Sequence, residues 1–394
     1  MSKGAATWKR VKFGEVVRLN KETCKDPASA GIERVIGLEH LEPGDLRVRS
    51  WGDVADGTTF TNRVRPGQLL FGKRRAYQRK VAVVEFDAIC SGDIYVFESA
   101  NPSNLLPELL PFICQTDSFF EHAVGTSAGS LSPRTNWSSL AEYEFALPPL
   151  EEQYRLAELL HGGNDTVECS RALVRAAHAA RVALREWLIN QSVSPTKAVG
   201  ELCEMQNGRP FPSSDYGKSG VRLLRPANLA PDGRLDWRPE RTVFMPDAYL
   251  EAASGHVVSR GDVVINLTAQ SLDDGFMGRV CFVRGQEKSF LNQRIGRFVR
   301  FRDGVVPEYL FRVLQGARFQ AHAIAMCEGT KVKHMFWRHI EVFRFALPPE
   351  DQQRRACEQM LAMDVAFNAA AKRSEEAGRL ASDAVNRALV RGAS

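Results

Sequence analysis

Two nearly identical phrases, 200 residues apart, constrain the fold of this chain more than any other feature of its sequence. The first, Phe145–Pro149, reads FALPP and is followed by the polar run Glu151–Arg155. The second, Phe345–Pro349, reads the same and is followed by Asp351–Arg355. Proline is well tolerated in the first turn of a helix, and acidic residues there complement the helix dipole. Each phrase therefore predicts the end of a strand, a turn and the start of a helix.

The sequence before each phrase is also repeated, with less similar wording. Pro107-Glu108 is matched by Pro307-Glu308, and the strand-like Gly67–Leu70 is matched by Gly261–Val264. The spacing between matched positions is 194 residues at the second pair and 200 at the first, so the halves differ by loop insertions. Short strands, turns and short helices alternate in both halves, which predicts a mixed α/β (α+β) domain in each. A shared frame with different loops is expected of one scaffold that displays two different surfaces.

A long run rich in Ala, Leu, Arg and Glu follows each phrase. Apolar residues recur at three- and four-residue steps from Leu156 to Leu188 and from Met360 to Leu389, which predicts two amphipathic helices. A helix of about 40 residues extends about 60 Å, far beyond a compact domain of about 150 residues. The helices could each pack on their own domain, or on each other as an antiparallel pair, which we favour. Gly162-Gly163 predicts a kink or break in the first helix.

Composition narrows the class of protein. The eight cysteines are scattered and form no C-x-x-C pair, which indicates a reducing cytosol and gives little support to a zinc ribbon or a disulfide scaffold. No apolar run approaches the length of a membrane span, and residues 1–8 lack the apolar segment of a signal peptide. The formal net charge of +5 permits an anionic partner without requiring one, so the placement of the charge matters more than its sum.

Catalytic signatures fail on inspection. Gly125–Gly129 matches G-x-S-x-G, but a helix precedes it where a nucleophile elbow needs a strand. Gly217-Lys218-Ser219 has the end of a P-loop without its first glycine. His334 and His339 are not one helical turn apart, and no cysteine or aspartate nearby completes a metal set. The sequence therefore predicts neither an active site nor a metal site.

Polar and cationic loops are the remaining candidates for function. Five of the eight residues from Lys73 to Lys80 are positive, and they lie between two strand-like runs, so they form a hairpin loop. Lys and Arg can hold DNA phosphates, while Arg, Gln and Asn can read base edges. The alternative is a solvated charge run that only adds solubility. The candidate DNA-binding residues of this loop are Lys73, Arg74, Arg75, Tyr77, Gln78, Arg79 and Lys80.

The second half has an equivalent loop, residues 266–279, which is less basic and richer in amides and hydroxyls. Two further polar stretches follow it in the sequence. The candidate DNA-binding residues of this half are Asn266, Thr268, Gln270, Ser271, Arg279, Gln293, Arg294, Thr330, Lys331 and Lys333. If both loops bind DNA, their different composition implies that the two halves read different sequences.

Taken together, these features resemble the specificity subunits of type I restriction–modification systems. The resemblance covers nearly the whole chain. It rests on the duplicated phrase (Leu147–Gln153 and Leu347–Gln353), the strands before it, and the glycine loops Gly129-Ser130 and Gly329-Thr330. The second phrase departs from the family pattern in having Glu350–Gln353 where a Leu-x-Glu-Gln run is usual.

The resemblance implies two target-recognition domains, residues 1–149 and 193–349, separated by an antiparallel coiled coil of the helices in residues 150–192 and 350–394. Each domain would read one half of an asymmetric, bipartite double-stranded DNA target. The chain would be a non-catalytic, cytoplasmic protein with no membrane contact and no cofactor of its own. Its partners would be modification subunits, typically two, and restriction subunits.

The same resemblance assigns the chemistry to those partners. S-adenosylmethionine, ATP and Mg²⁺ would be bound by the partner subunits, which would methylate adenine N6 or cleave the DNA. Two rival hypotheses stay open. One is an enzyme with an unrecognised site; the other is a non-catalytic DNA-binding or scaffold subunit of another phage-defence assembly.

Overall fold

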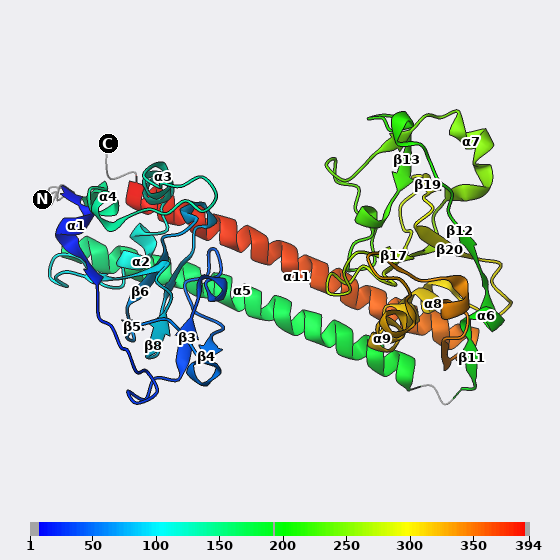
Figure 1. The fold of residues 1–394 in the computed structure, drawn as a ribbon, viewed down its shortest axis with the longest axis horizontal. Helices are drawn as coiled ribbons and strands as arrows, with labels where there is room; N and C mark the ends of the chain where they lie inside the picture. Colours follow the sequence, from blue (N-terminus) through cyan, green and yellow to red (C-terminus); the bar gives the residue numbers. More distant parts are fainter. Residues whose placement is uncertain (1–7, 192–193, 391–394) are drawn as a thin grey trace, which may run out of the picture. The chain divides into compact units, whose positions relative to one another are not determined.

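The computed structural model describes residues 8–191 and 194–390 (Figure 1). The chain forms two compact units, which we call unit 1 (residues 1–174 and 370–394) and unit 2 (residues 175–369). Each unit contains one globule and a part of both long helices. The domain boundaries expected from the sequence separate the globules from the helices and stay a prediction. Residues 1–7, 192–193 and 391–394, which those boundaries and the signal-peptide argument include, lie outside the described residues.

The described residues of unit 1 form three small sheets. Its first sheet pairs β1 (Lys9–Lys12) with β10 (Glu144–Leu147), the strand that ends in the FALPP phrase. The four-stranded second sheet has the order β2 (Val17–Asn20), β9 (Ile94–Ser99), β6 (Leu69–Gly72) and β7 (Val81–Val83). The third sheet has the order β4 (Gly52–Asp53), β3 (Arg34–Ile36), β8 (Ala88–Cys90) and β5 (Asn62–Val64).

Unit 2 repeats these three sheets in the same order and adds a fourth. The first sheet pairs β11 (Thr196–Ala198) with β22 (Arg344–Ala346). The second has the order β12 (Glu204–Asn207), β20 (Ile295–Val299), β16 (Val263–Asn266) and β18 (Val280–Phe282). The third has the order β14 (Phe244–Met245), β13 (Val221–Leu224), β19 (Ser289–Leu291) and β15 (Val257–Val258). The added sheet pairs β17 (Thr268–Ala269) with β21 (Lys333–His334). The repeated topology confirms the mixed helix-and-sheet fold expected from the sequence.

Short helices cover the sheets. In unit 1 these are α1 (Phe13–Val16), α2 (Leu110–Ile113), α3 (Asp117–Gly125) and α4 (Trp137–Ala141). In unit 2 they are α6 (Val199–Leu202), α7 (Tyr249–Ala252), α8 (Pro307–Leu314), α9 (Ala317–Met326) and α10 (Trp337–Ile340). Helix α1 packs closely on α4: a Cβ added to Gly14 of α1 would lie only 2.7 Å from the Cβ of Ala141 in α4.

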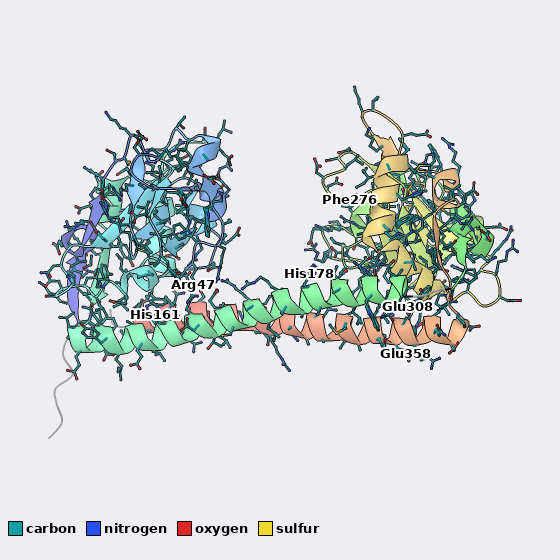
Figure 2. The ribbon with its side chains drawn as sticks, turned by 90° about the horizontal axis from the view of Figure 1, so that it is seen from below. Arg47, His161, His178, Phe276, Glu308 and Glu358 are labelled. Carbon is teal, nitrogen blue, oxygen red and sulfur yellow. The ribbon has the colours of Figure 1, made fainter. Side chains whose placement is uncertain are left out.

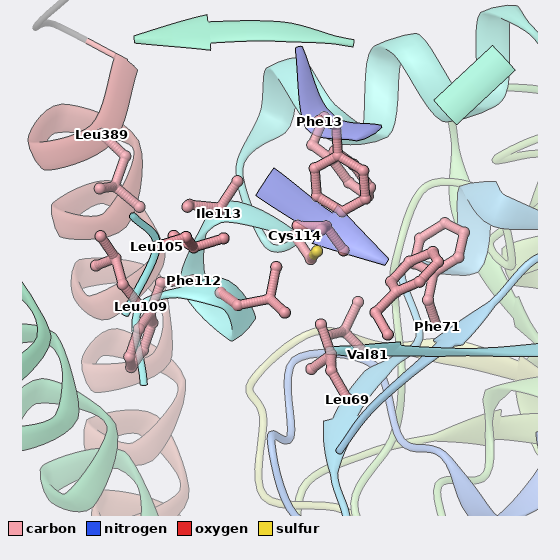
Figure 3. Close-up of a cluster of buried hydrophobic side chains, with 14 of the residues drawn as sticks. Phe13, Leu69, Phe71, Val81, Leu105, Leu109, Phe112, Ile113, Cys114 and Leu389 are labelled. Atoms are coloured by element: carbon pink, nitrogen blue, oxygen red, sulfur yellow. The ribbon is translucent and has the colours of Figure 1, made fainter. Parts of the chain in front are cut away.

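The core of unit 1 joins its globule to the helices. Figure 3 shows Phe13 and Phe71 from the globule and, further along the same cluster, Leu109 beside Leu389 of the C-terminal helix. The rings of Phe13 and Phe119 lie 5.0 Å apart. Burying a large apolar side chain contributes roughly 1.5–3 kcal/mol, so this continuous cluster holds the globule on the helices.

The two long helices are α5 (Leu150–Asn190) and α11 (Glu350–Val390). Helix α5 is continuous through Gly162-Gly163, so the predicted break is wrong. Glycine lowers helix stability by about 1 kcal/mol, a cost that tertiary packing of the apolar face outweighs.

The helices pack on each other as an antiparallel pair, as predicted (Figure 1). In unit 1 the Ser170 hydroxyl donates to the Ser374 hydroxyl at 3.2 Å. In unit 2 the Arg181 guanidinium lies 4.3 Å from the ring centre of Phe367 and 3.6 Å from the Asp364 carboxylate. A later residue of α5 thus meets an earlier residue of α11. No helix among the described residues has both the length and the apolar character needed to cross a membrane.

One glutamine explains why the repeated phrase ends as it does. The Gln153 side chain is buried; its Oε1 accepts from the Leu106 N–H at 2.8 Å, and its Nε2 donates to the carbonyls of Asn104 and Pro148, each at 2.8 Å. Gln353 makes the same three bonds, to Val306, Gly304 and Pro348. The glutamine therefore fastens the first turn of each long helix to the loop before α2 or α8.

Candidate nucleic-acid interface

The basic octet forms the predicted hairpin loop between the antiparallel strands β6 and β7. A short 3₁₀ turn, Ala76–Gln78, occupies the middle of the loop. Arg75 and Arg79 flank this turn with φ of 54° and 55°, the left-handed region that L-residues rarely adopt. Such a backbone persists only when the surrounding contacts hold it.

Three cations of this loop are used to hold it in place. Arg79 pairs with Asp117 at 2.6 Å, donates to the Gln115 carbonyl at 3.0 Å and lies over the Phe120 ring. Lys80 donates to the Leu38 carbonyl at 2.7 Å. Lys73 lies over the Tyr95 ring with its Nζ 4.6 Å from the ring centre. These contacts are structural, and they leave fewer free charges than the sequence suggests.

A second group of side chains gathers around Asp93, in the turn before β9. The Arg134 Nε donates to Asp93 Oδ1 at 2.8 Å, and the Arg74 Nη1 donates to Asp93 Oδ2 at 3.3 Å. The Ser132 hydroxyl accepts from Nη2 of Arg74 at 3.0 Å and from Nη2 of Arg75 at 3.4 Å. Hydrogen bonds and charge from Arg134 and Arg74 lower the pKa of the Asp93 carboxyl, against an opposing effect of burial.

Exposure separates the remaining candidates of the first loop. Tyr77 is 57% exposed and Gln78 is partly buried. Leu131, in the adjoining glycine loop, is 90% exposed. An aromatic ring and a leucine at this level of exposure are each available for contact with a partner molecule.

The loop between β16 and β18 is held by two of its predicted site residues. The Asn266 side chain is fully buried, and its Nδ2 donates to the carbonyls of Thr268 and Phe276, each at 2.7 Å. Arg279 donates to the carbonyls of Gly275 and Asp274 in this loop and to that of the distant Leu229, and it lies 4.0 Å from the ring centre of Phe276, which Figure 2 labels. Burial lowers the pKa of Arg279. Both residues therefore help to shape the loop.

The other candidates of unit 2 lie at its surface. Thr268 and Lys333 are partly buried on the paired strands β17 and β21. The exposed candidates are Gln270, Ser271, Gln293, Arg294, Thr330 and Lys331. No contact of any predicted site residue with DNA is tested by these observations, so those roles stay predictions.

Backbone hydrogen bonds bring the same segments together in both units. The Lys73 N–H donates to the Asp93 carbonyl at 3.0 Å, and the Leu267 N–H donates to the Arg294 carbonyl at 2.9 Å. The glycine loops close in the same way, because Ala128 is bridged to Arg134 and Glu328 to His334. Asp93 therefore corresponds to Arg294, Arg134 to His334, and Arg74 to Thr268.

Sequence reasoning missed Asp93 and Arg134. No sequence motif marks Asp93 as a site residue, because the two arginines that it binds, Arg74 and Arg134, lie far from it in the sequence. Arg134 could have been found, because the stretch Thr330–His334 was recognised as polar and Arg134 lies at the matching place of the first half.

The side chains of these loops include groups that can bind a nucleic acid. Among residues 8–191 and 194–390, no three His, Cys, Asp or Glu side chains gather as metal ligands. The cysteines in this part of the chain are free thiols, and burial raises the pKa of Cys90 and of Cys203 to about 12. The described loops combine cations, amides, hydroxyls and aromatic rings, which are the groups that contact phosphates and base edges.

Known proteins are similar in sequence to this chain. The chain is 21% identical over 328 residues to the type I restriction enzyme MjaVIII specificity subunit of Methanocaldococcus jannaschii, covering 79% of this chain and 72% of that protein. It is 29% identical over 141 residues to the type I restriction enzyme EcoDI specificity subunit of Escherichia coli, covering 33% of this chain and 30% of that protein. No family model matches the chain.

Solved structures show the same fold. A chain from a study of complex assembly in a type I restriction–modification system superposes with a TM-score of 0.60 at 19% identity, covering 98% of this chain and 99% of that chain. The S subunit of a type I system from M. genitalium superposes with a TM-score of 0.57 at 11% identity, covering 99% and 98%. The resemblance inferred from the repeated phrase is confirmed.

Proposed function

We propose that this chain, which shares its fold with type I specificity subunits, is the DNA sequence-specificity subunit of a type I restriction–modification complex. It binds an asymmetric DNA target with one half-site for each unit. The observation that carries this proposal is the repeated backbone frame, which brings a hairpin loop and a glycine loop together twice and equips them with different side chains. A frame that is kept while its loops vary fits two readers of different sequences.

The chain contributes recognition, and the transfer and cleavage reactions belong to its partners. Modification subunits bind S-adenosylmethionine and methylate adenine N6; restriction subunits use ATP and Mg²⁺. Exposed apolar side chains occur along the long helices, where partner subunits would cover them in the assembled complex. These residues are Tyr154, Leu159, Leu173, Trp187, Val365 and Leu380.

The test is a map of adenine methylation in cells that express the modification subunits with or without this chain. We expect methylation at one asymmetric motif of two specific parts separated by unspecified bases, and no such motif when the chain is absent. A motif that persists without the chain would contradict the proposal. The purified chain alone should neither bind S-adenosylmethionine nor methylate DNA, and turnover by the chain alone would favour an enzyme instead.

A scaffold of another phage-defence assembly is the second candidate, because the exposed helices alone would serve it. Selection of bound duplexes from a random library separates the two. A specificity subunit enriches defined sequences, whereas a scaffold without base recognition leaves the library unchanged.

A further inference from the structure

We infer that Arg134 reads a guanine in the half-site of unit 1, and that Asp93 is the positioning residue that aims it. The inference rests on the proposed function and names the residues by which unit 1 reads DNA. It assigns base recognition to a residue outside the basic hairpin loop, beside the arginines that the sequence favoured.

The first support is the way in which Arg134 is tethered. Its Nε and Nη2 donate to the two oxygens of Asp93, at 2.8 Å and 3.4 Å. An arginine has five N–H donors, so this side-on pairing leaves Nη1 and one hydrogen of Nη2 at the outer end of the guanidinium. Among the described residues, no hydrogen bond to Nη1 of Arg134 is formed.

The free end of the guanidinium has the geometry that a guanine requires. Two parallel N–H donors can bond O6 and N7 of guanine in the major groove, the commonest specific contact to a base. The Arg134 side chain is 50% exposed, so it can reach a ligand, while Asp93 is 21% exposed and can hold it from behind. Holding the side chain in one orientation before binding reduces the entropy lost on binding.

The neighbouring arginines are less available for this role. Arg74 donates through Nη1 to Asp93 and through Nη2 to Ser132, so both of its terminal nitrogens already have a protein partner, and its Nε is buried without one. Arg79 is held by Asp117 and the Gln115 carbonyl. Arg74 therefore also holds Asp93, and the cluster keeps a net positive charge because Arg74, Arg75 and Arg134 outnumber the one carboxylate.

Unit 2 has the opposite charge at the same place. Arg294, which is exposed, replaces Asp93, and His334 replaces Arg134. Within the described part of the chain, the Arg294 side chain forms no hydrogen bond or ion pair, and His334 stacks on Phe336 with ring centres 6.2 Å apart. The tethered arginine is thus particular to unit 1, and its loss should alter one half-site alone.

The experiment measures base preference with the full chain in complex with its modification subunits. Bound duplexes are selected from a random library, and relative affinity is measured for duplexes that differ at one base pair. We expect Arg134→Ala and Arg134→Lys each to reduce the preference for guanine at one position by roughly 5- to 150-fold, with the other half-site unchanged. Lysine keeps the charge but cannot form the paired contact, so it should not rescue the preference.

Asp93 is tested by two substitutions. Asp93→Asn should weaken the same guanine preference by a smaller factor without changing the preference elsewhere, because the amide holds the guanidinium less firmly. Asp93→Glu retains the carboxylate and should preserve more of the preference than the amide. A residue that only stabilised the fold would lower the melting temperature and affect all positions alike.

Arg10→Ala is the matched control, since Arg10 is another exposed arginine of unit 1 whose Nε donates to a carboxylate, Glu144, at 2.8 Å. It should leave both half-sites unchanged. If Arg134→Ala lowers affinity equally for all sequences and lysine restores it, Arg134 is a phosphate contact and the inference is overturned. Unchanged preference in a folded Arg134→Ala variant overturns it as well. If the unaltered complex selects no two-part motif, the proposed function itself fails.

Discussion

The two units solve one structural problem in different ways, namely how to fasten a globule to the long helices. Unit 1 uses a mesh of four charges, in which the partly exposed Arg49 and Arg171 both contact the buried Asp45 and Glu168. Unit 2 uses one buried residue, Arg312 of α8, which is 3% exposed and pairs with Asp364 of α11 at 2.6 Å.

The two units share the backbone hydrogen bonds of their loops and the buried glutamine of the repeated phrase. The other side chains at the contact between globule and helices differ. At the place of Arg312, unit 1 has Phe112, whose ring meets that of His161 at 4.8 Å. The comparison shows that the frame does not depend on any one side-chain chemistry at the helix contact. It therefore leaves the surface free to diverge, as the Asp93 and Arg294 positions do.

The largest loss of stability is expected from substitution of Arg312, which tests whether unit 2 depends on its buried ion pair. Arg312→Leu leaves Asp364 with the more distant Arg181, and removing one partner of a buried ion pair costs about 3–5 kcal/mol. Chemical denaturation should show this loss in unit 2. Arg312→Leu with Asp364→Leu should recover most of it, because the unpaired charge is gone. A single variant as stable as the parent would show that the pair is dispensable.

The next effect tests whether the two joints are equivalent. Gln153→Leu and Gln353→Leu should each lose about 2–4 kcal/mol, since three hydrogen bonds of about 0.5–1.5 kcal/mol each are removed and the backbone partners stay buried. Hydrogen exchange of the Leu106 and Val306 amides reports each joint separately. Clearly unequal losses would mean that the repeated phrase acts differently in the two units.

A smaller effect concerns the residue with left-handed backbone near the end of the β6–β7 loop and of the β16–β18 loop. Arg79 (φ 55°) corresponds to Gly278 (φ 66°) in unit 2. Arg79→Gly should be more stable than Arg79→Ala by about 1 kcal/mol, because glycine adopts this backbone without strain. Gly278→Ala should destabilise unit 2, since its new Cβ would also meet Ala323 at 2.7 Å. Thermal melting of the three variants measures the difference; an Arg79→Ala variant that equals the glycine variant would contradict the strain.

The smallest effect is the pH dependence of the stability that the Asp93 ion pairs contribute to unit 1. Unit 2 has an arginine, Arg294, at the corresponding position and lacks this carboxylate. The arginines lower the pKa of Asp93 below its ordinary value of 3.8. A carboxyl whose pKa is lower in the folded state contributes stability above its unfolded pKa, and that stability is lost as the pH falls through the folded pKa. NMR titration of the Asp93 carboxyl should show a midpoint below 3.8 that rises in Arg134→Ala. An unchanged midpoint would show that the tether does not form in solution.

The positions of the two hairpin loops could be predicted from the sequence, because each loop lies between two strands that are recognisable by their runs of apolar residues. Which cations are free could not be inferred. Lys80, Arg79 and Arg279 lie in loops, but their partners are carbonyls, rings and carboxylates far away in the sequence. The same limit hid the Asp93 tether, whose members lie 41 residues apart.

The sequence by itself determined the repeat, the two long helices and the loops that differ between the halves, since these follow from local periodicity and from proline at helix starts. Tertiary structure decided three other features. Helix α5 continues through Gly162-Gly163 because packing against the globule and α11 outweighs local propensity. The glutamine of the repeated phrase became a buried joint, and Arg134 became the tethered arginine of unit 1. Each depends on groups that meet only when the chain has folded, so no local pattern could reveal them.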